Sequence, residues 1–241
     1  MKTIALIPAR KNSKKVQRKN IRLLSKEPLI NHTIKAALGA RLVEAVVVST
    51  DCSETAQIAS RAGAWVPFVR PPNIARDNTP DPPVIRHAIE WIEKNSGKKL
   101  DAIAFLRPTT PFKTGVLIDE CVQKLQDDGE LSAVRTITPV EGVYHPYWCI
   151  KVQQGLLKPF IEGVQTEKYY QRQLLPACYR LNGVVDVVRR DRVMDCNDIY
   201  GDRTGFIEVE ETAAVDIDNE FDFQFCEFLM NKCTAAEKQP A

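Results

Sequence analysis

This sequence of 241 residues lacks the motifs of several common protein classes. It contains neither Gly-x-x-x-x-Gly-Lys-Ser/Thr nor Gly-x-Gly-x-x-Gly, which excludes a P-loop and the usual dinucleotide-binding loop. Its seven cysteines are an odd number without a Cys-x-x-Cys pair, which argues against a disulfide framework and against a zinc ribbon. We therefore expect reduced thiols and a cytoplasmic location.

Long apolar runs and a strong net charge are also missing. The apolar run before Pro8 is too short for a signal peptide, and no run approaches the length of a membrane span. The formal net charge is only +2, so no field of the whole protein favours nucleic acid or an anionic membrane. We predict a soluble protein, with no nucleic-acid or membrane partner, whose ligand is small and anionic.

A basic loop directly follows a predicted buried strand at the start of the chain. Residues 4–7 are apolar and stop at Pro8, and six Lys and Arg residues lie between positions 10 and 19. In α/β proteins, ligands bind beyond the carboxyl ends of strands, where N–H groups and lysines hold phosphate. The loop has no glycine, so side chains must carry more of that work. We interpret it as phosphate-binding; a solvated turn or a nucleic-acid patch is the alternative.

Apolar runs alternate with helical patterns through the first 138 residues. Predicted strands at 45–48 and 100–106 alternate with helices near 29–38, 53–62, 84–92 and 116–125, as in parallel sheets with helical crossovers. Beyond Pro139 the alternation stops, and 145–151 and 184–188 are predicted as antiparallel strands. We predict one α/β domain over 1–241: an open, mostly parallel sheet with helices on both faces and an inserted antiparallel arm at about 139–205.

Two aspartates near the C-terminal end of the chain form a candidate metal site. Asp216 and Asp218 follow apolar residues 213–215 in a predicted strand, where side chains at i and i+2 point the same way. Mg²⁺ in nucleotide sites takes one or two carboxylates together with phosphate oxygens and water. Asp218 could instead cap a helix that begins near Asn219, which is compatible with a metal on Asp216 alone.

Five short motifs follow one another along most of the chain. They are the basic loop Ala9-Arg10-Lys11-Asn12-Ser13-Lys14 with Lys19-Asn20, Arg70-Pro71, Pro108-Thr109-Thr110-Pro111-Phe112-Lys113-Thr114-Gly115, Arg180-Leu181-Asn182-Gly183 and Asp216-Ile217-Asp218. Together they resemble the signature of the N-acylneuraminate cytidylyltransferase family, the CMP-sialic acid synthetases. The resemblance implies a nucleotide-diphospho-sugar transferase type of fold. It also implies a homodimer with shared active sites, in which the arm of one subunit reaches into the site of the other.

The resemblance further implies a reaction and its residues. The anomeric hydroxyl of a 2-keto sugar acid attacks the α-phosphorus of CTP with Mg²⁺ as cofactor, giving a CMP-sugar and pyrophosphate. The implied nucleotide-binding residues are Arg10, Ser13, Lys14, Lys19, Asn20 and Arg70. The implied catalytic residues are Arg10, Lys14, Asp216 and Asp218, of which the two aspartates also hold Mg²⁺. The implied sugar-binding residues are Arg107, Trp148, Arg172, Asn182, Asp186, Ile199 and Tyr200, with Arg172 at the sugar carboxylate.

The positions at which this sequence differs from the sialic acid enzymes are among the implied sugar-binding residues. Those enzymes have Gln, Lys and Tyr where this sequence has Arg107, Trp148 and Asp186, and the stretch with Ile199 and Tyr200 is where the partner supplies two aromatics. We predict a nonulosonic-type acid other than N-acetylneuraminate. Another sugar acid, or a sugar 1-phosphate with a different nucleotide, is the alternative. A catalytically inactive or RNA-binding homologue is the alternative from another class, although RNA binding needs a broader basic surface or interleaved aromatics.

Overall fold

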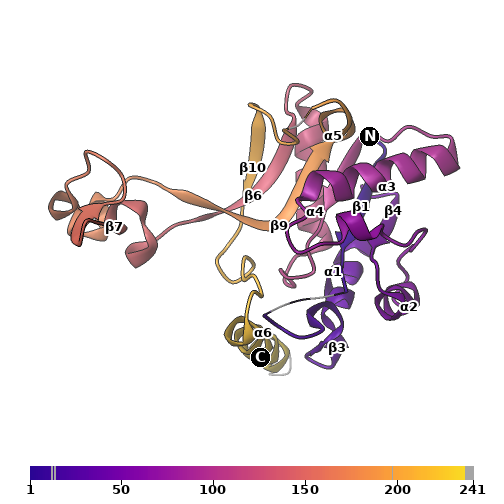
Figure 1. Cartoon of the computed structure of the whole chain (residues 1–241), viewed down its shortest axis with the longest axis horizontal. Helices are drawn as coiled ribbons and strands as arrows, with labels where there is room; N and C mark the ends of the chain where they lie inside the picture. The colour runs from indigo at the N-terminus through magenta and orange to yellow at the C-terminus, as the bar shows by residue number, and fades with distance from the viewer. Residues whose placement is uncertain (12, 14, 197, 237–241) are drawn as a thin grey trace.

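A six-stranded sheet forms the centre of the computed structural model, which describes residues 1–11, 13, 15–196 and 198–236, with side chains to residue 232 (Figure 1). The strand order is β10-β6-β9-β5-β1-β4. The strands are β1 (Thr3–Pro8), β4 (Ala45–Ser49), β5 (Ala102–Phe105), β6 (Ala133–Pro139), β9 (Tyr179–Arg189) and β10 (Thr204–Glu208). Only β9 runs antiparallel to its neighbours, β5 and β6. The predicted mostly parallel sheet is confirmed.

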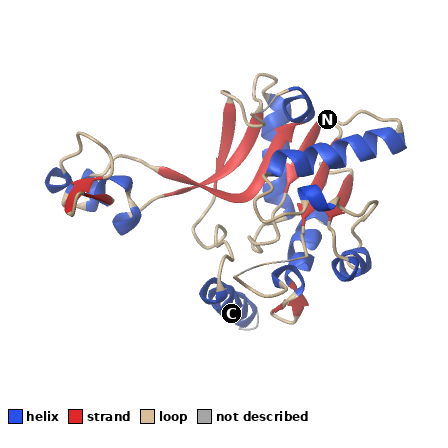
Figure 2. Ribbon diagram, in the orientation of Figure 1, coloured by secondary structure: helices blue, strands red, loops and turns tan. Residues whose placement is uncertain are grey.

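Helices cover both faces of this sheet, as predicted (Figure 2). They are α1 (Leu29–Leu38), α2 (Ser53–Arg61), α3 (Asp81–Ser96), α4 (Gly115–Asp127) and α5 (Arg190–Asp195), whereas α6 (Glu220–Ala236) packs in a separate core. Because side chains alternate along a strand, Ala5 and Ile7 of β1 pack in the core with α1, α2 and α4. Ile4 and Leu6 pack in the second core, with α3 and α5. A parallel strand buried on both faces therefore reads as one continuous apolar run.

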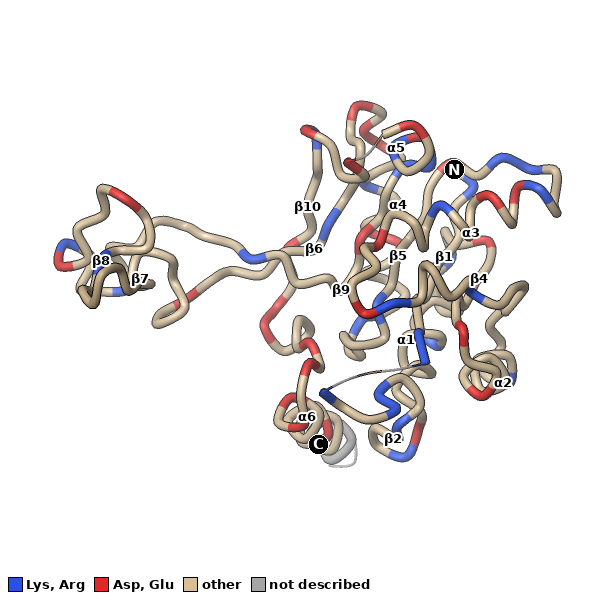
Figure 3. The backbone as a smooth tube through the Cα atoms, viewed as in Figure 1, with Lys and Arg blue, Asp and Glu red and all other residues tan. Residues whose placement is uncertain are grey.

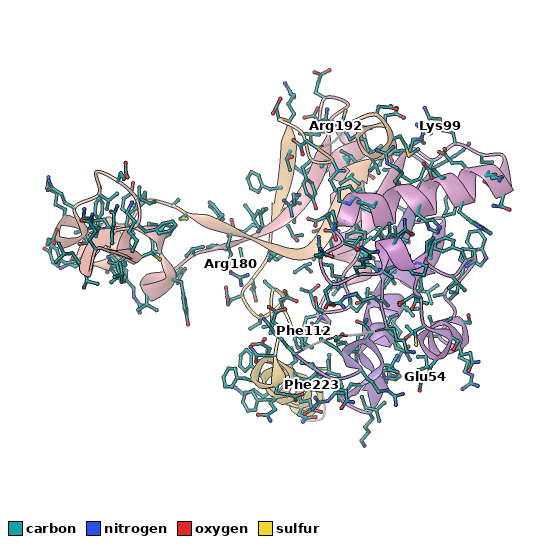
Figure 4. The ribbon with its side chains drawn as sticks, in the orientation of Figure 1. Glu54, Lys99, Phe112, Arg180, Arg192 and Phe223 are labelled. Atoms are coloured by element: carbon teal, nitrogen blue, oxygen red, sulfur yellow. The ribbon has the colours of Figure 1, made fainter. Side chains whose placement is uncertain are left out.

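The basic loop leads into a small third core under α6. The chain from the end of the loop to α1 contains η1 (Lys19–Ile21) and the two-residue strands β2 (Leu23–Leu24) and β3 (Glu27–Pro28). Val16 and Leu24 are buried there against Phe223 of α6, and Phe112 packs on the same cluster. Figure 4 labels Phe112 and Phe223, which lie near one another below the sheet. Packing of Val16, within the loop, and of Leu24, after it, therefore joins this part of the chain to the C-terminal helix.

An arm projects from the far side of the sheet, between β6 and β9 (Figure 1). It carries the antiparallel hairpin of β7 (Ile150–Gln153) and β8 (Leu156–Pro159). Its short helices are η3 (Gly142–Tyr144), η4 (Pro146–Trp148), η5 (Thr166–Tyr169) and η6 (Arg172–Leu174). Trp148 Nε1 donates to the Tyr169 carbonyl at 2.6 Å, and His145 Nε2 lies 3.0 Å from the Pro176 carbonyl. These contacts give the arm its own compact head.

The structure differs from the sequence predictions in three places. The arm is shorter than 139–205, because β9 and α5 lie in the main body. Within 145–151, residues Pro146–Trp148 form η4 rather than a strand, since Pro146 favours the start of a helical turn, and only Ile150 and Lys151 belong to β7. Residues 211–214 form a turn rather than a strand, and Asn219 rather than Asp218 caps α6, accepting from the Asp222 N–H at 3.1 Å. No helix in the described part of the chain is long and apolar enough to cross a membrane.

Candidate active site

A cavity of about 380 Å³ opens beyond the carboxyl ends of β1 and β5. Most of the predicted nucleotide-binding residues line it: Arg10, Ser13, Lys19, Asn20 and Arg70. Arg107, from the end of β5, and Asp218 also face it. Lys14 lies outside the described residues. The parallel strands thus bring together side chains that are far apart in the sequence, as the rule for ligand sites in such sheets predicts.

Lys19 and Asn20 are fixed by backbone oxygens rather than by other side chains. The Lys19 Nζ donates to the Ile217 carbonyl at 2.5 Å, and the buried Asn20 Nδ2 donates to the Arg10 carbonyl at 3.0 Å. Burial lowers the pKa of Lys19, although the carboxylates of Asp216 and Asp218 oppose that shift. The basic loop is therefore held against the 216–218 segment, and Figure 3 shows its Lys and Arg residues beside the acidic start of α6.

Arg70 is anchored at the end of β4. It is 4% exposed, its Nε donates to Ser49 Oγ at 3.0 Å, and its Nη2 donates to the Ser49 carbonyl. Burial lowers the pKa of Arg70 to about 10, while nearby Asp51 opposes the shift. The side chain consequently remains a cation at neutral pH, in a fixed position at the edge of the cavity.

Asp216 and Asp218 are exposed on either side of the buried Ile217. The Ile217 N–H donates to the Thr109 carbonyl at 2.8 Å, which fixes this extended segment without any strand. Asp218 Oδ2 lies 3.4 Å from Lys15 Nζ. No group of three or more His, Cys, Asp or Glu residues suited to a metal occurs among the described residues. Two carboxylates beside a cationic loop fit Mg²⁺ that completes its shell with phosphate oxygens and water.

A buried charge cluster includes Arg107, which lines the cavity. Asp186 is fully buried; its Oδ2 accepts from Arg107 Nη1 at 2.7 Å and its Oδ1 accepts from Arg135 Nε at 2.9 Å. Tyr200 Oη donates to the same Oδ2 at 3.2 Å. Burial would raise the pKa of Asp186, but the two guanidiniums outweigh burial and lower it. Arg107 also donates to Asp81, so this cation lies between two carboxylates.

Comparison with known proteins identifies the family. The sequence profile of the cytidylyltransferase family matches residues 4–232. The chain belongs to this family. It is 32% identical over 235 residues to the CMP-N,N'-diacetyllegionaminic acid synthase of Legionella pneumophila, covering 95% of this chain and 97% of that protein. It is 26% identical over 231 residues to the N-acylneuraminate cytidylyltransferase of Escherichia coli, covering 96% of this chain and 52% of that protein.

The fold of this cytidylyltransferase also has a counterpart among solved structures. A CMP-2-keto-3-deoxy-manno-octonic acid synthetase in complex with CTP superposes with a TM-score of 0.72 over 96% of this chain and 99% of that one, at 17% identity. That identity supports the fold alone. The predicted sugar nucleotidyltransferase type of fold, the predicted family and the predicted class of enzyme are thereby confirmed.

The structure separates the predicted sugar-binding residues. Arg107 alone among them lines the described cavity. Asn182 is buried between β6 and β9, where it bonds to Thr136 and Thr138. Trp148 and Arg172 lie on the arm. Asp186 is buried behind Arg107, to which it is hydrogen-bonded. Ile199 and Tyr200 differ from the expectation that their stretch serves a neighbour: Ile199 is buried in the core with α3, and Tyr200 bonds to Asp186.

Sequence reasoning missed one side of the cavity. The connection from η2 (Pro72–Ile74) to α3 contributes Arg76, Asp77 and Thr79, and α3 contributes its first residue, Asp81. The available signal was the run of polar and proline residues after Arg70-Pro71, which the sequence indicated only as a turn before a helix. Sequence reasoning also missed the role of Lys113, which is buried. Its ammonium group donates to the Arg107 carbonyl at 2.8 Å and to Thr110. Lys113 thereby holds the loop that carries Arg107.

Proposed function

We propose that this cytidylyltransferase transfers CMP from CTP to a nonulosonic acid and releases pyrophosphate. The observation that carries the proposal is one cavity lined by several cations, by Asp218, with Asp216 two residues away, and by Arg107 beyond the end of β5. That arrangement suits a triphosphate, a divalent cation and an acidic acceptor in a row. Membership of the family supports the choice of CTP.

The proposed chemistry needs positioning and charge neutralisation more than covalent participation by the protein. Arg10, Ser13 and Lys19 would hold the triphosphate, with Lys14 in the same loop. Asn20 and the anchored Arg70 would orient ribose or cytosine. Such groups lower the barrier because the cations are fixed before phosphate charge shifts towards the departing pyrophosphate. The sugar hydroxyl would approach the α-phosphorus from the end of the cavity where Arg107 lies.

Mg²⁺ is the cofactor that the donor set fits, with Asp216 and Asp218 as its protein ligands. Bound there, it would neutralise phosphate charge and bring the nucleotide and the acceptor hydroxyl together. Lys15 and Lys19 lie beside the same carboxylates, so this region carries mixed charge rather than a purely acidic one. Mixed charge of this kind suits a metal that arrives together with an anionic nucleotide.

The acceptor we favour is a legionaminic-type acid rather than N-acetylneuraminate. The synthase that uses the former in Legionella pneumophila is 32% identical to this chain, against 26% for the Escherichia coli neuraminate enzyme. The replacements at Arg107, Trp148 and Asp186 point the same way. Because Arg107 donates to Asp186 at 2.7 Å, we treat these two replacements as one paired unit.

We infer that two copies associate through the arm. Large apolar side chains are uncovered on it: Val143, Tyr144, Ile150, Val152, Leu156, Leu157, Phe160 and Tyr170. Trp148 and Arg172 lie on this arm and do not line the cavity of their own chain. A second copy could bring them to its partner's cavity, as family resemblance implies, and would bury the apolar surface.

The deciding experiment is pyrophosphate release from each of the four nucleoside triphosphates. The acceptors are N,N'-diacetyllegionaminic acid, N-acetylneuraminate, an octulosonic acid and a sugar 1-phosphate. We expect activity with CTP and a nonulosonic acid, dependent on added Mg²⁺. The proposal is wrong if pyrophosphate is released only with a sugar 1-phosphate, or if it is released equally when no acceptor is present.

A further inference from the structure

One segment of the chain supplies carboxylates to two of the four arginines that line the cavity, Arg10 and Arg107. The segment is residues 75–81, which runs from the end of η2 to the first residue of α3. Arg10, in the basic loop, donates to Asp77, and Arg107, beyond the end of β5, donates to Asp81. Both carboxylates line the cavity. Groups suited to bind substrate anions are therefore paired with anions of the protein itself.

The two carboxylates that hold Arg107 differ in how firmly they are held. The side chain of Asp186 is 1% exposed and also accepts from Arg135 and Tyr200. The side chain of Asp81 is 38% exposed. Removing a partner from a buried pair leaves an uncompensated charge in the interior, whereas a half-exposed pair exchanges with water at little cost. Asp186 is thus the permanent partner of Arg107, and Asp81 is the exchangeable one.

A charge count shows what could replace Asp81. The guanidiniums of Arg107 and Arg135 carry two positive charges against the one negative charge of buried Asp186. Asp81 balances the remaining charge. The Cζ atom of Arg135 lies 3.7 Å from the centroid of the Tyr200 ring, and Arg135 does not line the cavity. Of the two arginines in the cluster, Arg107 is therefore the one that presents the remaining positive charge to a ligand. An incoming carboxylate would keep the cluster neutral, whereas a neutral ligand would not.

The backbone around Arg107 leaves its guanidinium little freedom. Gly183 has a φ of +66°, and a Cβ there would lie 3.2 Å from Arg107 Nη1. The guanidinium also lies over the Phe105 ring, 5.0 Å from its centroid. With Asp186 holding Nη1, Arg107 keeps its place when Asp81 moves away. Asp81 itself lies in the first turn of α3, where the helix dipole favours a released carboxylate.

We propose, resting on the function proposed above, that Arg107 recognises the carboxylate of the sugar acid and that Asp81 is the internal ligand that this carboxylate displaces. A guanidinium fork suits a carboxylate through paired hydrogen bonds. Competition from Asp81 favours acceptors that carry a negative charge at this point. Asp81 therefore contributes to specificity without contacting the acid that is bound.

The test measures the KM and the calorimetric affinity of N,N'-diacetyllegionaminic acid and N-acetylneuraminate, with CTP and Mg²⁺ present for the KM. Asp81→Asn should tighten binding of the acid that the wild type uses by roughly two- to fivefold, the range expected for a half-exposed pair. The KM for CTP should stay unchanged. The methyl ester of the same acid, which lacks the charge, should gain nothing. Arg107→Lys should weaken binding of the acid by about tenfold while preserving the charge beside Asp186.

Asp191→Asn is the matched control, because Arg190 is likewise held by a mostly buried carboxylate, Glu93 (19% exposed), and a more exposed one, Asp191 (63%), and neither lines the cavity. This variant should leave the affinity for the acid and the KM for CTP unchanged. If Asp81→Asn binds the acid more weakly, Asp81 supports Arg107 and is not displaced, and the proposal is wrong. Unchanged affinity for the acid, or an equal gain in affinity for the methyl ester, would also contradict the proposal. A wild type that releases no pyrophosphate with any acid would instead defeat the proposed function itself.

Discussion

The cavity edge of the sheet and the projecting arm are built in opposite ways. At the edge, polar side chains are fixed within the chain: Arg70 by Ser49, and Lys19 by the Ile217 carbonyl. On the arm, apolar side chains are uncovered, with Val152 73% and Leu157 69% exposed. An edge that satisfies its own polar groups is preorganised for a ligand, whereas an arm that leaves apolar surface in water needs a second protein surface.

The strongest test of the cavity edge is Asp216→Asn. We expect turnover to fall on the order of a thousandfold, because a metal at such a site supplies several kcal/mol of charge stabilisation. The melting temperature should change little, since Asp216 is exposed. Steady-state pyrophosphate release and Mg²⁺ titration calorimetry check this. Ordinary Mg²⁺-dependent turnover in the variant would remove Asp216 from the site.

The strongest test of the arm is the double substitution of Val152 and Leu157 by Asp. These residues face each other across the β7–β8 hairpin, so two charges on one face should oppose burial against another copy. We expect the mass in sedimentation equilibrium to halve and sugar turnover to fall, with the circular dichroism spectrum retained. Lys158→Ser, on the neighbouring pair of the same hairpin, is the control and should leave the mass unchanged. A wild type that is already monomeric would contradict the role of the arm.

A smaller effect is expected from Arg10→Ala at the nucleotide end. Losing charge-assisted hydrogen bonds of about 1.5–3 kcal/mol should weaken CTP binding by roughly ten- to a hundredfold. Isothermal calorimetry with CTP measures this. Arg41→Ala removes an equally cationic side chain that is 91% exposed and far from the cavity, so it should leave the affinity unchanged. Equal affinity in both variants would make the basic loop a solvated turn.

The smallest effect is a pH dependence of stability that comes from Lys113. Burial, with the nearby charge of Arg107, lowers the pKa of Lys113 to about 7 from 10.5. Between these values the unfolded chain binds the proton and the folded chain does not, so the free energy of unfolding rises with pH, by at most about 1.4 kcal/mol per unit. Lys113→Met should lack this slope in urea unfolding at pH 7, 8 and 9. Parallel pH dependences in the two proteins would contradict the shift.

Local patterns predicted a large part of this molecule. The apolar residues 4–7, the basic loop and the alternation of strands and helices lie within short stretches, so periodicity alone indicated a parallel sheet with a phosphate-binding edge. The exposed pair Asp216 and Asp218 around Ile217 kept the alternation predicted for a strand, although a hydrogen bond to Thr109 rather than a ladder holds it. The family followed from five short motifs for the same reason.

The pairing of distant side chains was decided only by the tertiary structure. Arg107 meets Asp186, 79 residues later, because β5 and β9 pair with Phe105 opposite Asp186. Lys19 meets the Ile217 carbonyl across 198 residues. The sequence alone determined which residues stand at the end of each strand. Which of them face one another depends on strand order and register, and these are set by packing of the whole core, which no local pattern encodes.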